Sequence, residues 1–123
     1  MKTIINKQYQ LIHKLHEDFY GDQYLAKDTN SGQHVSVKLE SRYTWYPSLY
    51  HESKLLQHLS GTKGISEFIG IGCHGDYTWC ATELVGENLE KCLISSGGKF
   101  PLQTVLLLAD QMLLVIEALH HKQ

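Results

Sequence analysis

Lys38 and Glu52 are the two residues whose types and spacing best suit binding chemistry. Lys38 lies in the β-branched segment 35–39, which predicts a short strand. Because side chains alternate along a strand, Lys38 shares one face with Ser36 and Glu40. Glu52 falls within an apolar stripe at helical spacing, formed by Leu49, Leu55, Leu56 and Leu59. We therefore expect a buried helix carboxylate that takes the strand lysine as its cation.

Taken separately, a strand lysine and a helix glutamate are usually solvated surface residues. The sequence segments that contain them favour an ion pair instead. Residues 38–41 (Lys-Leu-Glu-Ser), 52–55 (Glu-Ser-Lys-Leu) and 108–112 (Leu-Ala-Asp-Gln-Met) follow one another in register. In order and separation they resemble the casein kinase I family of serine/threonine protein kinases, from about Tyr9 to the end of the chain. The resemblance implies that Lys38 and Glu52 form the ion pair that positions nucleotide phosphates in kinases.

Composition narrows the classes of protein. A chain of 123 residues with 42% hydrophobic and 20% charged residues is one globular domain or part of a larger one. A net charge of -2 without a dense Lys/Arg run argues against a nucleic-acid partner. No uninterrupted apolar run reaches membrane-spanning length and no signal peptide is evident, so we expect no membrane partner and a cytoplasmic or nuclear location.

The cysteines and histidines predict no metal site. Three cysteines without CxxC spacing favour free thiols over a disulfide framework or a zinc site. The histidine pairs at 13/16 and 120/121 lack a convergent third ligand in the sequence.

Hydrophobic periodicity predicts an α+β fold. Strands are expected at 9–15, 24–26, 35–39, 68–73 and 77–83, with helices from Pro47 to about Leu59, at 88–94 and from Pro101 onward. The resemblance implies a protein-kinase-like small lobe with its hinge in residues 1–86, a five-stranded antiparallel sheet plus one helix. Residues 87–123 would then be the truncated start of a large lobe, a short helix and a long apolar helix.

The resemblance also implies the residues of a nucleotide site. These are Gly21, Ala26, Ser36, Lys38, Glu83 and Val85, with Glu52 as the ion-pair partner and Thr82 as the gatekeeper. Gly21 is the one glycine left of the family's three in the glycine-rich loop, since His16 and Asp18 occupy the other two positions. The alternative is that residues 16–21 are only a turn that connects two strands.

Three features of this region predict weak ATP binding. Glu17 and Asp18 bring carboxylates to a loop that should cradle a polyanion, and two unit charges at 4 Å repel by roughly 4 kcal/mol at an effective dielectric near 20. Gln23 stands where a β-branched apolar residue would cover an adenine ring, whereas the small Ser36 would leave room for one. The resemblance therefore implies ATP as the ligand, but we expect this chain to bind ATP weakly and to hold no metal ion.

No catalytic residue can be assigned. The 123 residues contain neither a His-Arg-Asp catalytic loop nor an Asp-Phe-Gly motif, so the chain is expected to be inactive by itself. The helix from Leu102 to Leu119 is apolar almost all round, which is typical of the middle of a larger domain. We expect a protein partner or self-association through Leu102, Leu107 and Leu114. The aromatic residues 43, 45 and 46 are interpreted as packing.

Three functions stay open at this point. The chain could be a non-catalytic casein kinase I-like pseudokinase fragment that serves as a protein interaction module. It could be the ATP-binding part of a serine/threonine kinase whose catalytic half comes from a downstream segment or a second chain. It could also be an expressed gene fragment with no selected role.

Overall fold

The fold is α+β and divides into two units. The computed structural model describes residues 3–19 and 21–122, without the side chain of Asp18. The first unit comprises residues up to 60 together with 66–84, and the second comprises 61–65 together with 85 onward. The boundary thus falls between Leu84 and Val85, and the loop 61–65 belongs with the helices that follow it. Each unit is described by itself.

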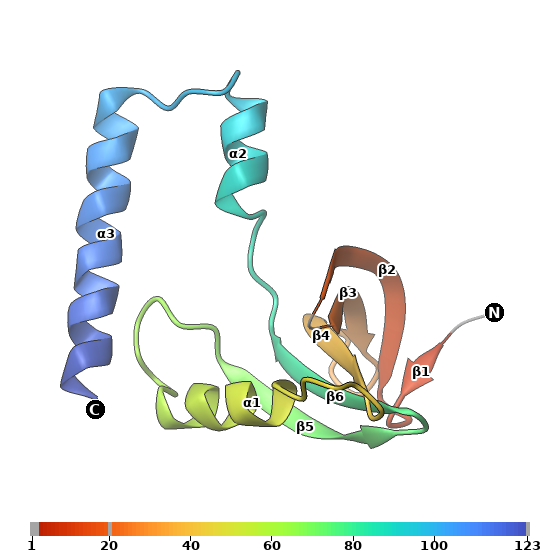
Figure 1. The fold of residues 1–123 in the computed structure, drawn as a ribbon. Coiled ribbons are helices and arrows are strands. Elements are labelled where there is room, and N and C mark those ends of the chain that lie inside the picture. Colours follow the sequence, from red (N-terminus) through yellow and green to blue (C-terminus); the bar gives the residue numbers. More distant parts are fainter. Residues whose placement is uncertain (1–2, 20, 123) are drawn as a thin grey trace. The chain divides into compact units, whose positions relative to one another are not determined.

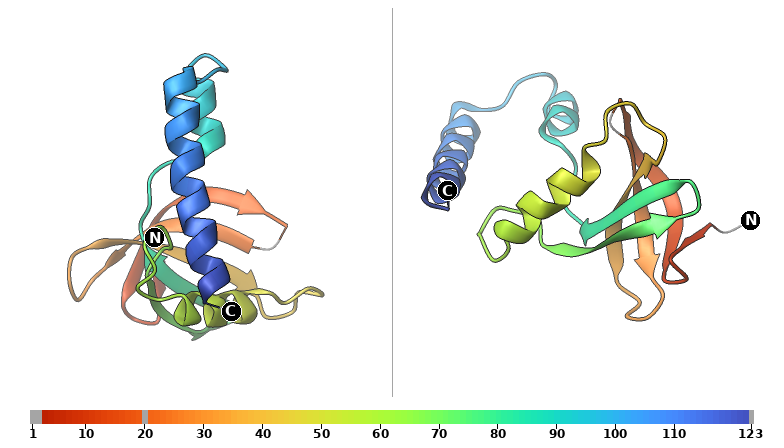
Figure 2. Two further views of the ribbon diagram at one scale, coloured as in Figure 1. Left: turned by 90° about the vertical axis from the view of Figure 1, so that its left-hand side faces the viewer. Right: turned by 60° about the horizontal axis from the view of Figure 1, so that its bottom comes forward.

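The first unit is built on one curled antiparallel sheet with strand order β1-β2-β3-β4-β6-β5 (Figure 1). Its strands are β1 (Ile4–Ile5), β2 (Tyr9–Asp18), β3 (Gly21–Asp28), β4 (His34–Ser41), β5 (Phe68–His74) and β6 (Tyr77–Glu83). The two-residue turn at Gly75 and Asp76 that joins β5 to β6 confirms the predicted hairpin, with Gly75 at φ 59°. The curl of the sheet is visible in the right-hand view of Figure 2.

The sheet has six strands where five were expected. The additional strand β1 pairs Ile4 with Gln10 and Ile5 with Tyr9. A tight turn joins β1 to β2, in which Asn6 and Lys7 both have positive φ, 55° and 57°. A strand of two residues is too short to produce an alternating pattern, so sequence periodicity could not indicate it.

The core of the first unit lies on the β4 face that carries the valines. Tyr9 and Trp79 meet there with ring centroids 5.4 Å apart. The buried cluster consists of Ile5, Tyr9, Ala26, Val35, Val37, Leu39, Trp79 and Ala81. Strand alternation sends Ser36, Lys38 and Glu40 to the opposite face, as predicted.

Helix α1 (Leu49–His58) lies beside β5 and β6 in both views of the first unit (Figures 1 and 2). Its buried residues are Leu49 and Ser53, while Leu55 is about half exposed. The aromatic residues in the preceding loop do not pack as expected: Tyr43 and Tyr46 are exposed and Trp45 is 92% exposed. Tyr46 contacts the ring of Phe19 at a centroid distance of 5.8 Å, so these rings gather at the surface instead.

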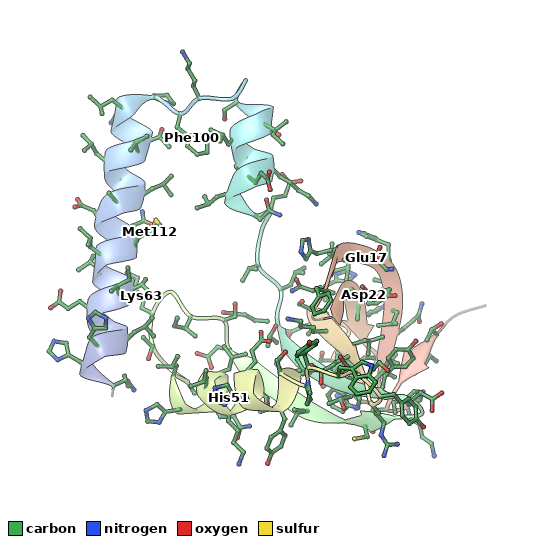
Figure 3. All side chains as sticks on the ribbon, in the orientation of Figure 1. Glu17, Asp22, His51, Lys63, Phe100 and Met112 are labelled. Atoms are coloured by element: carbon green, nitrogen blue, oxygen red, sulfur yellow. The ribbon has the colours of Figure 1, made fainter. Side chains whose placement is uncertain are left out.

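The second unit consists of α2 (Leu89–Ser95), α3 (Leu102–His121) and the loop 61–65. Asn88 caps α2 by accepting a hydrogen bond from the Lys91 N–H at 2.8 Å. In Figure 3 the side chain of Phe100 points into the space between α2 and α3. The loop 61–65 packs closely on α3, because a Cβ atom built on Gly64 would collide with the side chain of Val115.

Helix α3 is long and apolar enough to cross a membrane, judged by length and composition, and none of its residues is buried. No uninterrupted apolar run long enough to span a membrane was expected from the sequence. The run is interrupted by Asp110, Gln111 and Glu117, but the helix as a whole still meets the criterion.

Candidate functional site

A polar stripe crosses the first unit on the sheet face opposite the core. In the strand register, Lys38 of β4 faces Gln23 of β3 on one side and Cys80 of β6 on the other. Ser36 faces Thr82 in the same way. The stripe therefore brings the predicted residues Ser36, Lys38 and Thr82 together on one face.

Lys38 and Glu52 form the predicted ion pair. The Nζ atom of Lys38 lies 3.2 Å from Oε2 of Glu52, close enough for a charge-assisted hydrogen bond. The expectation that Glu52 is buried is wrong, since its side chain is 47% exposed and that of Lys38 is 23% exposed. The apolar stripe of α1 is only partly covered, which leaves this carboxylate in contact with water. Such a pair contributes about 0 to 1 kcal/mol to stability.

Glu40 is a buried carboxylate to which the sequence analysis assigned no role. Its Oε2 atom accepts hydrogen bonds from the backbone N–H groups of Ser48 and Leu49, both at 2.9 Å, and lies 3.4 Å from the Ser48 hydroxyl oxygen. The residue is only 6% exposed. Two features of the sequence could have indicated it: Glu40 shares a strand face with Lys38, and it precedes the N-cap residue Ser48 by eight residues.

Ser36 and Gln23 are hydrogen-bonded to each other. The amide Nε2 of Gln23 donates to the hydroxyl oxygen of Ser36 at 2.6 Å, and Ser36 is buried. The resemblance had assigned Ser36 the role of leaving space for a ring and Gln23 a position above it. The amide of Gln23 instead contacts the serine directly, so the space beside Ser36 on this face is taken by a polar side chain.

Gly21 sits next to Lys38 and needs to be glycine. Its φ is +141°, and a Cβ atom placed on it would lie 2.6 Å from the carbonyl oxygen of Leu39 and 3.6 Å from Cε of Lys38. Substitution would therefore press directly against β4 beside the ion pair.

The segment 16–18 is strand and not an open loop. His16 pairs with Gln23, Glu17 with Asp22 and Asp18 with Gly21, so these three residues belong to β2. The structure therefore corrects the expectation of a six-residue loop at 16–21, because residues 16–18 and Gly21 lie in paired strands. The side chain of Asp18, to which a repulsive charge was assigned, lies outside the described residues.

The charge of Glu17 is shared with a lysine. Lys14 Nζ lies 3.6 Å from Glu17 and 3.4 Å from Asp22, and Figure 3 shows these two acidic side chains at the same end of the hairpin. Desolvation acts to lower the pKa of Lys14, but the hydrogen bond and charge of Asp22 together with Glu17 raise it. The repulsion expected from Glu17 toward an anionic ligand is thus partly compensated.

The structure places three residues of the expected nucleotide site differently. Ala26 is fully buried in the core cluster beside Val35, on the sheet face away from Ser36 and Lys38, so the structure does not bring it together with these two residues. Glu83 lies at the end of β6, where its N–H donates to the Glu67 carbonyl at 3.0 Å and its carboxylate accepts from the Glu67 N–H at 3.0 Å. Val85 belongs to the second unit.

Cys80 adds a thiol to the polar stripe. Burial, and secondarily the charge of Glu52, raises its pKa to about 11, while Lys38 acts in the opposite direction. The thiol is therefore protonated and unreactive near neutral pH. Within the residues that the structure describes, no group of three or more His, Cys, Asp or Glu side chains is arranged to hold a metal ion.

Helix α3 provides a second candidate surface, the α3 apolar surface. Its large exposed side chains are Leu102, Val105, Leu106, Leu107, Met112, Leu113, Leu114 and Ile116, each at least 45% exposed. Leu102, Leu107 and Leu114, the residues expected to meet a partner, all belong to this set. Exposed apolar surface of this extent is typical of an interface.

Comparison with protein-family models found no family model that matches the chain.

Proposed function

We propose that this chain is a casein kinase I-like pseudokinase module that mediates protein interaction and does not by itself transfer phosphate. The observation that carries the proposal is the α3 apolar surface, with eight large side chains at least 45% exposed. Fully burying an exposed side chain of this kind contributes about 1.5 to 3 kcal/mol, so one that is already half covered contributes about half as much. Covering all eight would contribute roughly 6 to 12 kcal/mol before the costs of association, which is comparable with the roughly 5 to 15 kcal/mol stability of a whole domain.

The kinase-like part of the proposal is supported by the order of elements in the first unit. Strands β2 to β6, with α1 between β4 and β5, agree with the five strands and one helix that the resemblance implies. The strand lysine and the helix glutamate of that arrangement are 3.2 Å apart. The non-catalytic part concerns this chain by itself, since its 123 residues hold no His-Arg-Asp or Asp-Phe-Gly motif.

A protein surface suits α3 better than a lipid bilayer. Asp110 and Gln111 lie near the middle of the helix. A carboxylate at the centre of a membrane-spanning helix costs about 2.5 to 3.5 kcal/mol or more. At the edge of a protein interface the same carboxylate can stay in water, so no such cost arises.

The second candidate function is the ATP-binding part of a serine/threonine kinase completed by another segment or chain. It is favoured by one observation, the formed Lys38–Glu52 pair, because a chain without a nucleotide role does not require this pair. The hydrogen-bonded Gln23 and Ser36 argue for the weaker nucleotide binding that we expect.

Sedimentation velocity of the purified chain tests the interaction function, first with a second copy as the available partner. We expect concentration-dependent association at tens of micromolar. The variant Leu107→Lys/Leu114→Lys should shift the chain toward monomer, because two exposed apolar side chains become charged. The matched control is Gln103→Lys/Gln111→Lys, which adds the same two charges at exposed polar positions of α3.

Two outcomes would contradict the proposal. A monomer at all concentrations that also floats with phospholipid vesicles would assign α3 to a membrane. Equal effects of the leucine and glutamine substitutions would mean that charge, and not the apolar surface, governs association.

A further inference from the structure

Helix α1 starts without a cap of its own. Ser48 is the N-cap residue, yet its side chain makes no capping hydrogen bond within the helix. The first N–H groups of a helix need an acceptor, which a Ser, Thr, Asp or Asn at the N-cap normally supplies. Here the acceptor comes from another element, since Glu40 of β4 takes the N–H groups of Ser48 and Leu49. A negative charge at this end also suits the helix dipole.

Apolar packing holds α1 to the sheet only weakly. Of its ten residues, Leu49 and Ser53 are buried, and Leu49 is one of the two residues whose N–H groups Glu40 binds. Leu55 is about half exposed and Tyr50 is mostly exposed. The helix start is therefore held at Ser48 and Leu49, by the buried side chain of Leu49 and by the carboxylate of Glu40.

Glu40 and Lys38 hold α1 at two successive points. They are two residues apart on the same face of β4, and their contacts on α1 lie at its first residue and about one turn later, at Glu52. A shift of the helix start would carry Glu52 with it. The Glu40 contact is buried and fixed to backbone atoms, whereas the Lys38 contact joins two flexible and partly exposed side chains.

We propose that Glu40 is the positioning residue for the Lys38–Glu52 pair: it fixes where α1 begins, and the ion pair forms as a consequence. This inference does not depend on the proposed function, because it concerns how the strand holds the helix whether or not a ligand binds. It predicts that loss of Glu40 removes the effect of Lys38, whereas loss of Lys38 leaves the Glu40 contact in place.

Amide hydrogen exchange of the whole chain tests the inference. The variants are Glu40→Ala and Glu40→Gln, each with and without Lys38→Met, and Glu90→Gln on α2 serves as an exposed control of equal charge change. In Glu40→Ala we expect exchange in α1 to rise at least tenfold, which corresponds to about 1.4 kcal/mol. Glu40→Gln keeps an acceptor oxygen and should give a rise of about threefold to fivefold. Exchange in β2 and β3 should change less than twofold.

A second measurement uses Cys80 as a local probe. With Cys73 and Cys92 replaced by serine, Cys80 is the remaining thiol, and it lies on the polar stripe opposite Lys38. Alkylation of Cys80 at pH 8 should accelerate in Glu40→Ala along with exchange in α1. The Glu90→Gln control should match the parent protein in both measurements.

The coupling with Lys38 decides between positioning and a purely structural contribution. In the parent protein, Lys38→Met should raise exchange in α1 by about twofold to threefold, and it should add nothing in the Glu40→Ala background. Independent, multiplicative effects of the two changes would overturn the inference. Two further results would also overturn the inference. One is an exchange rate in α1 of Glu40→Ala that stays within twofold of the parent protein. The other is an equal rise of the exchange rates in α1 and in the sheet in both Glu40 variants. If Glu40→Ala does not fold, the Glu40→Gln series decides by the same criteria.

Discussion

The ammonium group of Lys38 and the carboxylate of Glu52 are 3.2 Å apart, although fourteen residues and a strand-to-helix connection separate them in the chain. Both side chains are partly open to water, so the pair contributes little to stability. Its importance is positional, because it lies at the edge of a polar stripe where the Gln23–Ser36 hydrogen bond and the Cys80 thiol are its neighbours.

Replacement of Gly21 by alanine should destabilise the first unit by about 2 kcal/mol or more. The residue has φ +141°, and an added Cβ atom would lie 2.6 Å from the backbone oxygen of Leu39. Left-handed strain in a non-glycine residue costs roughly 1 to 2 kcal/mol before this collision is counted. Urea denaturation followed by tryptophan fluorescence measures the loss.

Gly32→Ala is the matched control for Gly21→Ala. Gly32 also has a positive φ, +78°, but nothing lies within 4 Å of the added atom. This variant should lose only about 1 kcal/mol, from backbone strain. Equal losses at both positions would mean that Gly21 has no close contact with β4.

Cys80 should make the protein less stable as the pH rises from about 9 to 11. Its thiol has a pKa of about 11 in the folded state, against an ordinary value of 9.0. In this interval the unfolded chain releases the proton and the folded chain keeps it, so unfolding is favoured. Two pKa units correspond to about 2.7 kcal/mol, of which about 2.3 kcal/mol should be lost by pH 11, where the folded thiol is half ionised.

The variant Cys80→Ala isolates this contribution. The free energy of unfolding of each protein is measured by urea titration at pH 8, 9, 10 and 11, and the slopes are compared rather than the absolute values. The slope attributable to the thiol should disappear in the variant. Parallel curves for the two proteins would show that Cys80 keeps an ordinary pKa in the fold.

The Gln23–Ser36 hydrogen bond should oppose nucleotide binding. On the family resemblance, Gln23→Val would restore an apolar cover for a base and release Ser36. The parent chain should show no thermal shift at micromolar ATP, and the variant should bind at least tenfold more tightly than the parent. Gln10→Val, on β2, is the matched control. Micromolar binding by the parent chain would refute this prediction.

The triple change His16→Gly, Glu17→Ser and Asp18→Gly should strengthen ATP binding, but by less than the removal of two negative charges alone would predict. These residues pair with Gln23, Asp22 and Gly21, respectively, on β3, and glycine weakens a strand. Removal of Glu17 also leaves Lys14 paired with Asp22, at 3.4 Å, so the lysine is not released toward an anion. The experiment compares ATP titrations of the triple variant, Gln23→Val and their combination, and the combination should bind best.

Phosphoryl transfer should be absent from the purified chain. With magnesium, ATP and casein or an acidic peptide, phosphate incorporation should equal that of Lys38→Met, because the 123 residues contain no catalytic aspartate in a His-Arg-Asp motif. Turnover that depends on Lys38 would be incompatible with a non-catalytic role.

Local patterns in the sequence were sufficient to predict most of the elements. Alternation placed β4 and the face of Lys38, and the glycine turn at 75–76 placed the β5–β6 hairpin. The helix pattern placed α1, α2 and α3 to within a few residues. The Lys38–Glu52 contact was predictable because a same-face rule for the strand and a helical stripe each point one side chain toward the other element.

The tertiary structure decided everything that depends on which surfaces meet. It buried Ala26 in the core, opened Glu52 and Trp45 to water, and paired Gln23 with Ser36 across two strands. It also gave Glu40 its contact with the start of α1. Period and propensity describe how a segment folds along its own axis. Burial and hydrogen bonding between strands and helices depend on the curl of the sheet and on the position of α1 against it. Both are determined jointly by residues far apart in the chain.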